Sequence, residues 1–137
     1  MNNIYTITDP SQSNATFTRI FNDGRDIEAW LTLYEPDATL LYGPDKAIGN
    51  EAIRGVLTEL AKAPGEMQSR LNFCEINGDI AVTRSDSRLV HEGKILMEAS
   101  SIEVLRRQPD GNWLFIIDLP LGASLPSAWA DQAENES

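Results

Sequence analysis

The stretch QSRLNFCEINGDIAVTRSDSRLV, residues 68–90, decides the fold. It consists of two runs rich in apolar and β-branched residues on either side of Asn77-Gly78, a dipeptide typical of tight hairpin turns. This pattern predicts two antiparallel strands over about residues 68–76 and 80–90. The rest of the chain either continues this sheet or supplies helices to cover it.

The segment after this hairpin has the pattern of further strands. Glu92-Gly93 and the run PDGN at 109–112 are turn sequences, and they separate strands predicted over residues 95–107 and 113–119. Four consecutive strands joined by short turns form an antiparallel meander. Pro120 ends it, because proline cannot donate a hydrogen bond to a strand ladder.

The segment before the hairpin has helical periodicity instead. Helices are predicted to start at the N-cap residues Asp9, Asp26 and Asn50, each followed by apolar residues three and four positions apart. The second helix is expected to end just before a proline at position 36 and to carry Trp30 and Tyr34 on its apolar side. Helices early and strands late predict an α+β fold, a curved antiparallel sheet wrapped around N-terminal helices.

Length and charge limit the possible functions. The 137 residues predict a single domain over 1–137, with a core at about 10–122 and an acidic tail at 130–137. Eleven basic and 21 acidic residues give a net charge of −10 without a basic patch, so we expect no nucleic-acid partner. Neither a secretory signal nor a membrane span is visible, which predicts a cytoplasmic protein with no membrane partner.

Metal and cysteine chemistry are not expected. Cys74 and His91 are the only residues of their types, which excludes an internal disulfide and leaves no clustered metal ligands. We interpret Cys74 as a small apolar strand residue and His91 as a solvated turn residue. No metal and no cofactor are therefore predicted. Trp129 lies outside any predicted element and could cover a pocket or contact a partner subunit.

The hairpin turns also predict which strand residues share a face of the sheet. With two residues in each turn, Arg84 lies on the same face as Glu103 and Asp118, and this face is expected to line a pocket under the helices. The predicted pocket residues are Trp30, Tyr34, Tyr42, Phe73, Val82, Met97, Leu105 and Ile116.

The opposite face is too apolar to be left in water, so we expect it to join two copies of the chain in a homodimer. Its predicted contacts are Thr83, Ser85, Ile102, Val104, Phe115 and Ile117.

Arg84, Glu103 and Asp118 form the candidate catalytic group, and two interpretations stay open. In a dry pocket, an arginine keeps a nearby carboxylate ionised, while a second carboxyl group can have a raised pKa and act as acid or base. The alternative is a buried ion network that stabilises the fold and does no chemistry.

Three segments resemble one known family. The run GRDIEAWLTLYEPDA at 24–38, IGNEAI at 48–53 and EVLRRQPDGNW at 103–113 resemble the SnoaL-like family of the nuclear transport factor 2-like superfamily. The resemblance implies a cone-shaped α+β domain. It says little of function, because members include ketosteroid isomerase-like enzymes, polyketide cyclases, dehydratases and proteins without an assigned activity.

The chain departs from the ketosteroid isomerase-like pattern at two positions. Tyr42 lies near the place of the catalytic carboxylate, and Thr18 lies where that enzyme has a tyrosine in its first helix. Steroid isomerisation by that mechanism is therefore disfavoured.

Two functions follow as hypotheses. The first is a homodimer that binds a small apolar molecule in its cone-shaped cavity. The second is an acid/base enzyme, an isomerase, cyclase or dehydratase, that uses Asp118 or Glu103 for proton transfer and Arg84 or Tyr42 to stabilise negative charge. The sequence does not identify the ligand.

Overall fold

The computed structural model describes residues 5–42, 45–122 and 128–129. The helical elements are η1 (Pro10–Gln12), α1 (Ser13–Asp23), α2 (Ile27–Leu31) and α3 (Asn50–Leu60). The strands are β1 (Tyr34–Tyr42), β2 (Asp45–Ile48), β3 (Glu66–Asn77), β4 (Ile80–His91), β5 (Lys94–Arg107) and β6 (Trp113–Leu119). The acidic tail predicted at 130–137 lies outside the described residues.

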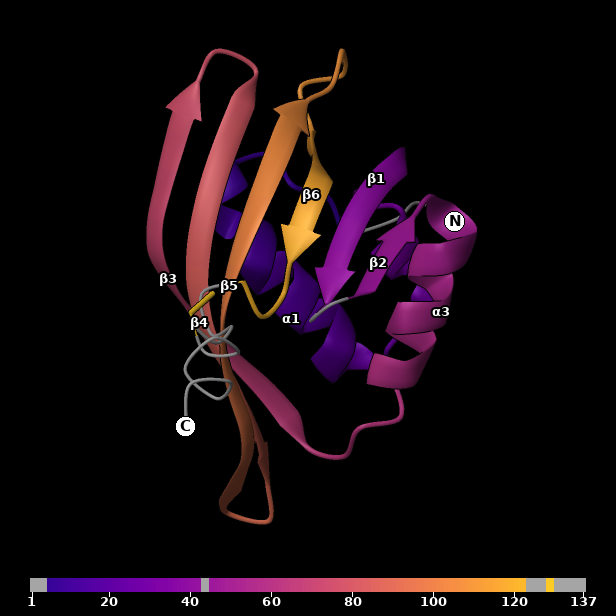
Figure 1. Cartoon of the computed structure of the whole chain (residues 1–137), viewed down its shortest axis with the longest axis vertical. Helices are drawn as coiled ribbons and strands as arrows, with labels where there is room; N and C mark the ends of the chain where they lie inside the picture. The colour runs from indigo at the N-terminus through magenta and orange to yellow at the C-terminus, as the bar shows by residue number, and fades with distance from the viewer. Residues whose placement is uncertain (1–4, 43–44, 123–127, 130–137) are drawn as a thin grey trace.

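The strands form one curved sheet in the order β2-β1-β6-β5-β4-β3 (Figure 1). Neighbouring strands are antiparallel except for β1 and β6, which run parallel. The predicted α+β architecture, with a late meander and N-terminal helices, is confirmed.

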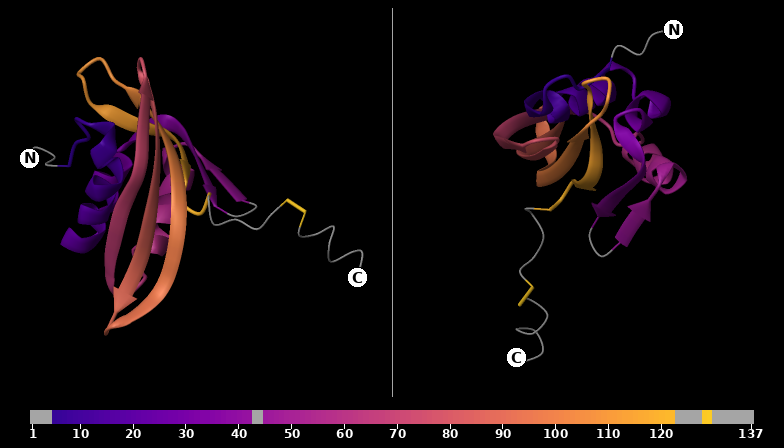
Figure 2. Two further views of the ribbon diagram at one scale, coloured as in Figure 1. Left: turned by 90° about the vertical axis from the view of Figure 1, so that its left-hand side faces the viewer. Right: turned by 90° about the horizontal axis from the view of Figure 1, so that it is seen from above.

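The helices pack on the sheet at two places. Helix α1 lies on one side of β3–β5, as the left view of Figure 2 shows. Helix α3 packs against β1, β2 and α2. The largest fully buried side chains lie between the helices and the sheet: Trp30, Phe21, Phe115, Ile7, Ile20, Leu33, Leu40, Ile53, Leu57 and Leu105. No helix in the described part of the chain is long and apolar enough to cross a membrane.

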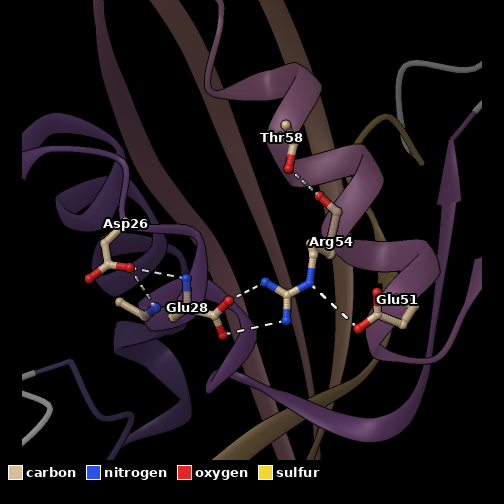
Figure 3. Close-up of polar contacts among 6 residues, drawn as sticks. Asp26, Glu28, Glu51, Arg54 and Thr58 are labelled. Carbon is tan, nitrogen blue, oxygen red and sulfur yellow. Dashed lines mark hydrogen bonds and ion pairs between the residues drawn. The ribbon is translucent and has the colours of Figure 1, made fainter.

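The start of α2 is the predicted one. The Asp26 carboxylate accepts hydrogen bonds from the backbone N–H groups of Glu28 and Ala29, at 3.0 and 3.3 Å. The Arg54 guanidinium on α3 then pairs with Glu28 and also lies 3.6 Å from Glu51 (Figure 3). These contacts hold the two short helices together at the surface.

The end of α2 differs from the prediction. The helix ends at Leu31, and Tyr34 is the first residue of β1 rather than part of a helical stripe. The backbone N–H of Phe115 donates to the carbonyl oxygen of Leu33 at 2.8 Å, so the chain already pairs with β6 at this point. Pairing with a distant strand has overridden the helical periodicity of the local sequence.

A bulge in the β4–β5 hairpin changes the predicted faces. Val90 pairs with Ile95 but Leu89 pairs with Met97, so Leu96 is an extra residue on β5. Because a one-residue shift moves side chains to the other face, Glu103 lies opposite Thr83 rather than Val82.

The corrected register defines two faces of the sheet. The helix-covered face includes the buried residues Ala81, Thr83, Ser85, Ser101, Glu103, Leu105, Phe115 and Asp118. The outer face consists of Phe73, Val82, Arg84, Ile102, Val104 and Ile117, which are half-buried or exposed.

Two sets of predictions about these faces were wrong. Arg84 pairs with Ile102 on the outer face and so does not share a face with the two carboxyl groups. Thr83, Ser85 and Phe115 were predicted as dimer contacts, but they are buried on the helix-covered face of the same chain. The extra residue at Leu96 on β5 explains the misplacement of Arg84, Thr83 and Ser85. A second extra residue, Ile116 on β6, explains that of Phe115.

Candidate functional site

Glu103 and Asp118 lie directly opposite each other on β5 and β6, as the sequence predicted. Glu103 is 2% exposed and Asp118 is 6% exposed. Buried carboxyl groups are rare unless they are paired with a cation or hydrogen-bonded, so their surroundings decide what they can do.

Glu103 is held through both of its carboxyl oxygens. Its Oε1 accepts hydrogen bonds from Asn14 Nδ2 at 2.6 Å and from Ser101 Oγ at 2.8 Å. Its Oε2 accepts one from Thr83 Oγ1 at 3.2 Å. Three donors from α1, β5 and β4 therefore fix its position, and Glu103 is the anchored member of the pair.

Asp118 has one oxygen bonded and one oxygen open. The Tyr34 hydroxyl donates a 2.6 Å hydrogen bond to Oδ2, and Oδ1 accepts none from any described residue. Tyr34 reaches this point because it starts β1, beside Phe115 on β6, and the two rings lie 5.1 Å apart. Asp118 is thus the member of the pair that is free to contact another molecule.

Burial sets the charge state of this pair. Burial, followed by the neighbouring Asp118 charge, raises the pKa of Glu103 to about 7, although its three hydrogen bonds partly oppose the increase. Burial likewise raises the pKa of Asp118 to about 6, and the Tyr34 hydrogen bond partly opposes this. Because the two groups interact, they titrate as a pair close to neutral pH.

Tyr34 remains a hydrogen-bond donor throughout this range. Burial, followed by the nearby Asp118 carboxylate, raises the pKa of its phenol well above the usual value. The ion pairs formed by described residues include neither Glu103 nor Asp118. Arg84, the predicted partner, lies on the other side of the sheet, so the partners of the carboxyl pair among the described residues are hydrogen-bond donors.

A cavity of about 110 Å³ lies against the two carboxyl groups. Apolar side chains make up most of its wall, and no lysine, arginine or histidine lines it among the described residues. The lining residues are Asn14, Phe17, Leu60, Met67, Ser87, Met97, Ala99, Ser101, Glu103, Phe115, Asp118, Pro120 and Leu121. An apolar cavity with a few convergent polar groups is the usual form of a small-molecule site.

The sequence placed only part of this cavity correctly. Of the eight predicted pocket residues, Met97 lines it, and Tyr34 reaches it through Asp118. Trp30 lies behind the wall, with its ring 5.2 Å from that of Phe17. Leu105 is on the helix-covered face but is fully buried in the core.

The other four predicted pocket residues do not line the cavity. Phe73 and Val82 are on the outer face, and Phe73 is 44% exposed. Tyr42, at the far end of β1, is 36% exposed. Ile116 is the extra residue of a β6 bulge, because Leu105 pairs with Phe115 and Val104 with Ile117.

Asn14, Phe17 and Met67 were missed, and they come from α1 and β3. Asn14 is one residue from the start of its helix, and its hydrogen bond to Glu103 spans 89 positions. No local pattern distinguishes it from a solvated asparagine. Phe17 was recognisable as an apolar helix residue, but its place on the cavity wall depends on how α1 crosses the sheet.

The remaining candidate residues lie away from the cavity lining. His91 is the last residue of β4, and the β4–β5 hairpin extends beyond the helices in Figure 1. Its Nε2 lies 3.8 Å from the Glu92 carboxylate. Cys74 is half-buried, and burial raises the pKa of its thiol. Trp129 is 73% exposed. Among described residues, no group of three or more His, Cys, Asp or Glu side chains is placed to hold a metal ion.

A larger depression of about 840 Å³ lies over β3–β5 and borders the cavity at Ser87 and Ala99, but neither carboxyl group of the pair lines it. It is shallow and is lined mainly by polar side chains, among them Arg70, Asp86, Arg88 and Glu98. Because the depression contains no buried acid or base and its wall is mainly polar, the smaller cavity is the better candidate site.

Solved structures share this architecture. One is a protein of unknown function from Mycobacterium tuberculosis, with 24% identity and a TM-score of 0.68 over 80% of this chain and 67% of that one. Another, a nuclear transport factor 2-like protein of unknown function from Pseudomonas putida, has 20% identity and a TM-score of 0.63 over 79% and 80%. A ketosteroid isomerase-like protein from Erwinia carotovora atroseptica has 21% identity and a TM-score of 0.59 over 78% and 88%.

These likenesses show that the chain has the nuclear transport factor 2-like fold, which confirms the predicted fold class. No family model and no curated protein sequence matches the chain. At this level of identity the solved structures show the fold and not an activity.

Proposed function

We propose that this chain is a small-molecule-binding domain and that the cavity beside Glu103 and Asp118 is its ligand site. The observation that carries this proposal is that Asp118 lines a mostly apolar cavity and that its Oδ1 has no donor among the described residues. A buried carboxyl group without a cation or a full set of hydrogen bonds costs stability, so its presence in a cavity favours a binding role. Motifs in residues 24–38 and 103–113 favour the SnoaL-like group within this fold.

A cavity-filling variant tests this proposal. Ala99 on β5 lines the cavity, so Ala99→Leu should fill it and abolish the binding of small probe molecules detected by NMR. Glu98→Leu introduces the same side chain at the neighbouring exposed position and is the matched control. Equal binding to both variants would show that the probes bind elsewhere.

Acid/base catalysis is the second candidate function, and the titration of the pair near neutral pH favours it. A carboxylate with a pKa of about 6 can accept a proton from carbon next to a carbonyl group and return it. Asp118 would be the proton-transfer group because it has an open oxygen, and Glu103 and Tyr34 would be positioning residues. The test is deuterium exchange into small ketones: Asp118→Asn should abolish it, and a rate equal to that of the wild type would exclude this role.

We also propose a homodimer, formed through the outer face. Its support is the row of aliphatic residues Ile102, Val104 and Ile117 on that face, of which Ile117 is 38% exposed. The three predicted contacts that lie on the helix-covered face are not part of this proposal.

A further inference from the structure

We infer that the ligand is a small protonated amine, whose ammonium group contacts the open oxygen of Asp118 while its hydrocarbon body occupies the apolar part of the cavity. This inference rests on the proposed ligand site and adds the chemical class of the ligand.

The polar end of the cavity provides acceptors and lacks a cation. Glu103 and Asp118 lie side by side there, and Oδ1 of Asp118 is without a donor among the described residues. An ammonium group has three donors and no acceptor, which matches a carboxylate oxygen together with hydroxyl oxygens. The Ser87 and Ser101 side chains line the same cavity and supply such oxygens.

Charge excludes the opposite class of ligand. A carboxylate or phosphate ligand would approach two acidic groups with no lysine, arginine or histidine in the described wall to offset the repulsion. The net charge of −10 adds to this repulsion. A neutral ligand would displace water from Asp118 and leave its charge uncompensated, whereas an ammonium group would provide the missing partner.

The volume limits the size of the amine. A cavity of about 150 Å³ holds benzene, and this one measures about 110 Å³. An alkyl chain of about four carbon atoms is therefore a suitable body. Phe17, Leu60 and Met97 are among the side chains that would contact it.

Binding should depend on pH because the acceptor is the ionised pair. The titratable groups at this point are Tyr34 from β1, Glu103 from β5 and Asp118 from β6, while α1 and α3 contribute Asn14, Phe17 and Leu60, which do not titrate. A primary alkylamine stays protonated up to about pH 10. Its affinity should therefore rise between pH 5.5 and 8, as the carboxyl groups lose their protons.

Three probes of similar size separate the alternatives: n-butylamine, 1-butanol and butyrate, titrated into the full chain at pH 7.5 and followed by NMR. We expect n-butylammonium to bind at least tenfold more tightly than 1-butanol, and butyrate to show no binding. Asp118→Asn should remove at least tenfold of the ammonium affinity and leave that of 1-butanol within twofold. Asp86→Asn, which removes an exposed carboxylate on the outer side of β4, is the matched control and should change neither.

The outcomes distinguish this inference from the proposed function. If 1-butanol or butyrate binds as tightly as n-butylammonium, the inference is wrong but the cavity remains a ligand site. If none of the three probes binds, both are wrong. If the Asp118→Asn protein fails to fold, the Glu103→Gln variant takes its place, because this variant also removes one of the two charges. It should lower the affinity for n-butylammonium but not the affinity for 1-butanol. An unchanged affinity for n-butylammonium would contradict the inference.

Discussion

The hydroxyl group of Tyr34 donates a 2.6 Å hydrogen bond to Oδ2 of Asp118, joining the first residue of β1 to the end of β6 across 84 positions of sequence. This bond holds Oδ2 in place, while Oδ1 has no donor among the described residues and Asp118 lines the cavity. The two residues therefore define how the carboxyl pair faces the cavity.

Stability should fall as the pH rises from 5.5 to 8. Both carboxyl groups have folded-state pKa values above their unfolded ones, so the folded protein binds more protons in this range and loses stability as they dissociate. The expected loss in the free energy of unfolding is on the order of 3 kcal/mol. Each group contributes about 1.4 kcal/mol for every pH unit in which it is protonated in the folded protein and ionised in the unfolded protein. Urea unfolding at several pH values measures it.

Glu103→Gln should flatten this pH dependence and raise stability at pH 8 by about 2 kcal/mol, because it removes one buried charge and keeps the shape of the side chain. Asp86→Asn is the control, since hydrogen bonds from Ser100 and Asn72 lower the pKa of Asp86 below its usual value and out of this range. A Glu103→Gln protein with the slope of the wild type would show that Glu103 is solvated.

Tyr34→Phe should destabilise the protein by about 1–3 kcal/mol, because it removes the donor to a buried carboxylate and leaves the ring in place. The loss should be greater at pH 8 than at pH 5, since only the ionised Asp118 needs this donor. Tyr42→Phe removes a hydroxyl from an exposed tyrosine and should change stability by less than about 0.5 kcal/mol. Equal losses in the two variants would contradict the account.

Arg84→Met tests the corrected register of the sheet. Because Arg84 is on the outer face, the substitution should change stability by less than about 1 kcal/mol. Thr83→Ala removes a buried donor to Glu103 and should cost about 1–3 kcal/mol at pH 8. Urea unfolding measures both losses. A larger loss for Arg84→Met than for Thr83→Ala would indicate that Arg84 contacts the carboxyl pair.

Substitutions on the outer face test the proposed homodimer. Val104→Lys adds a charge to the centre of that face and should convert a dimer to a monomer in light scattering at micromolar concentration. Arg84→Met, on the same face, adds no charge and should leave a dimer. A monomeric wild-type protein would exclude this assembly.

Much of the fold could be predicted because its signals are local. Strong turn sequences separate β3, β4, β5 and β6, and the Asp26 cap marks the start of α2. The opposition of Glu103 and Asp118 was predicted from a two-residue turn. In the structure Arg107 pairs with Trp113 across a longer loop, and the extra residue Ile116 on β6 restores the predicted opposition. The bulge at Leu96 could not be predicted, because no residue type at that position requires an extra residue. Without the bulge, Arg84 was predicted on the face of the carboxyl pair, whereas it lies on the outer face.

The donors of the site were beyond local reasoning for the same reason. Tyr34 has helical spacing with Trp30, and only its pairing with β6 places it in a strand beside Asp118. Asn14 meets Glu103 because α1 crosses the sheet at that point, which no pattern in α1 specifies. The two carboxyl residues could therefore be recognised from the sequence pattern. Their hydrogen-bond donors could not, because these depend on the strand order and on where α1 crosses the sheet.

An NMR titration of the side-chain carboxyl carbons of Glu103 and Asp118 in the full chain, with and without n-butylamine, tests whether this buried pair is a ligand site. We expect both groups to titrate between about pH 5.5 and 7.5 in the free protein, and the amine to shift both transitions to lower pH. Titration of both groups near pH 4, unchanged by the amine, would contradict a buried carboxyl pair that serves as a ligand site.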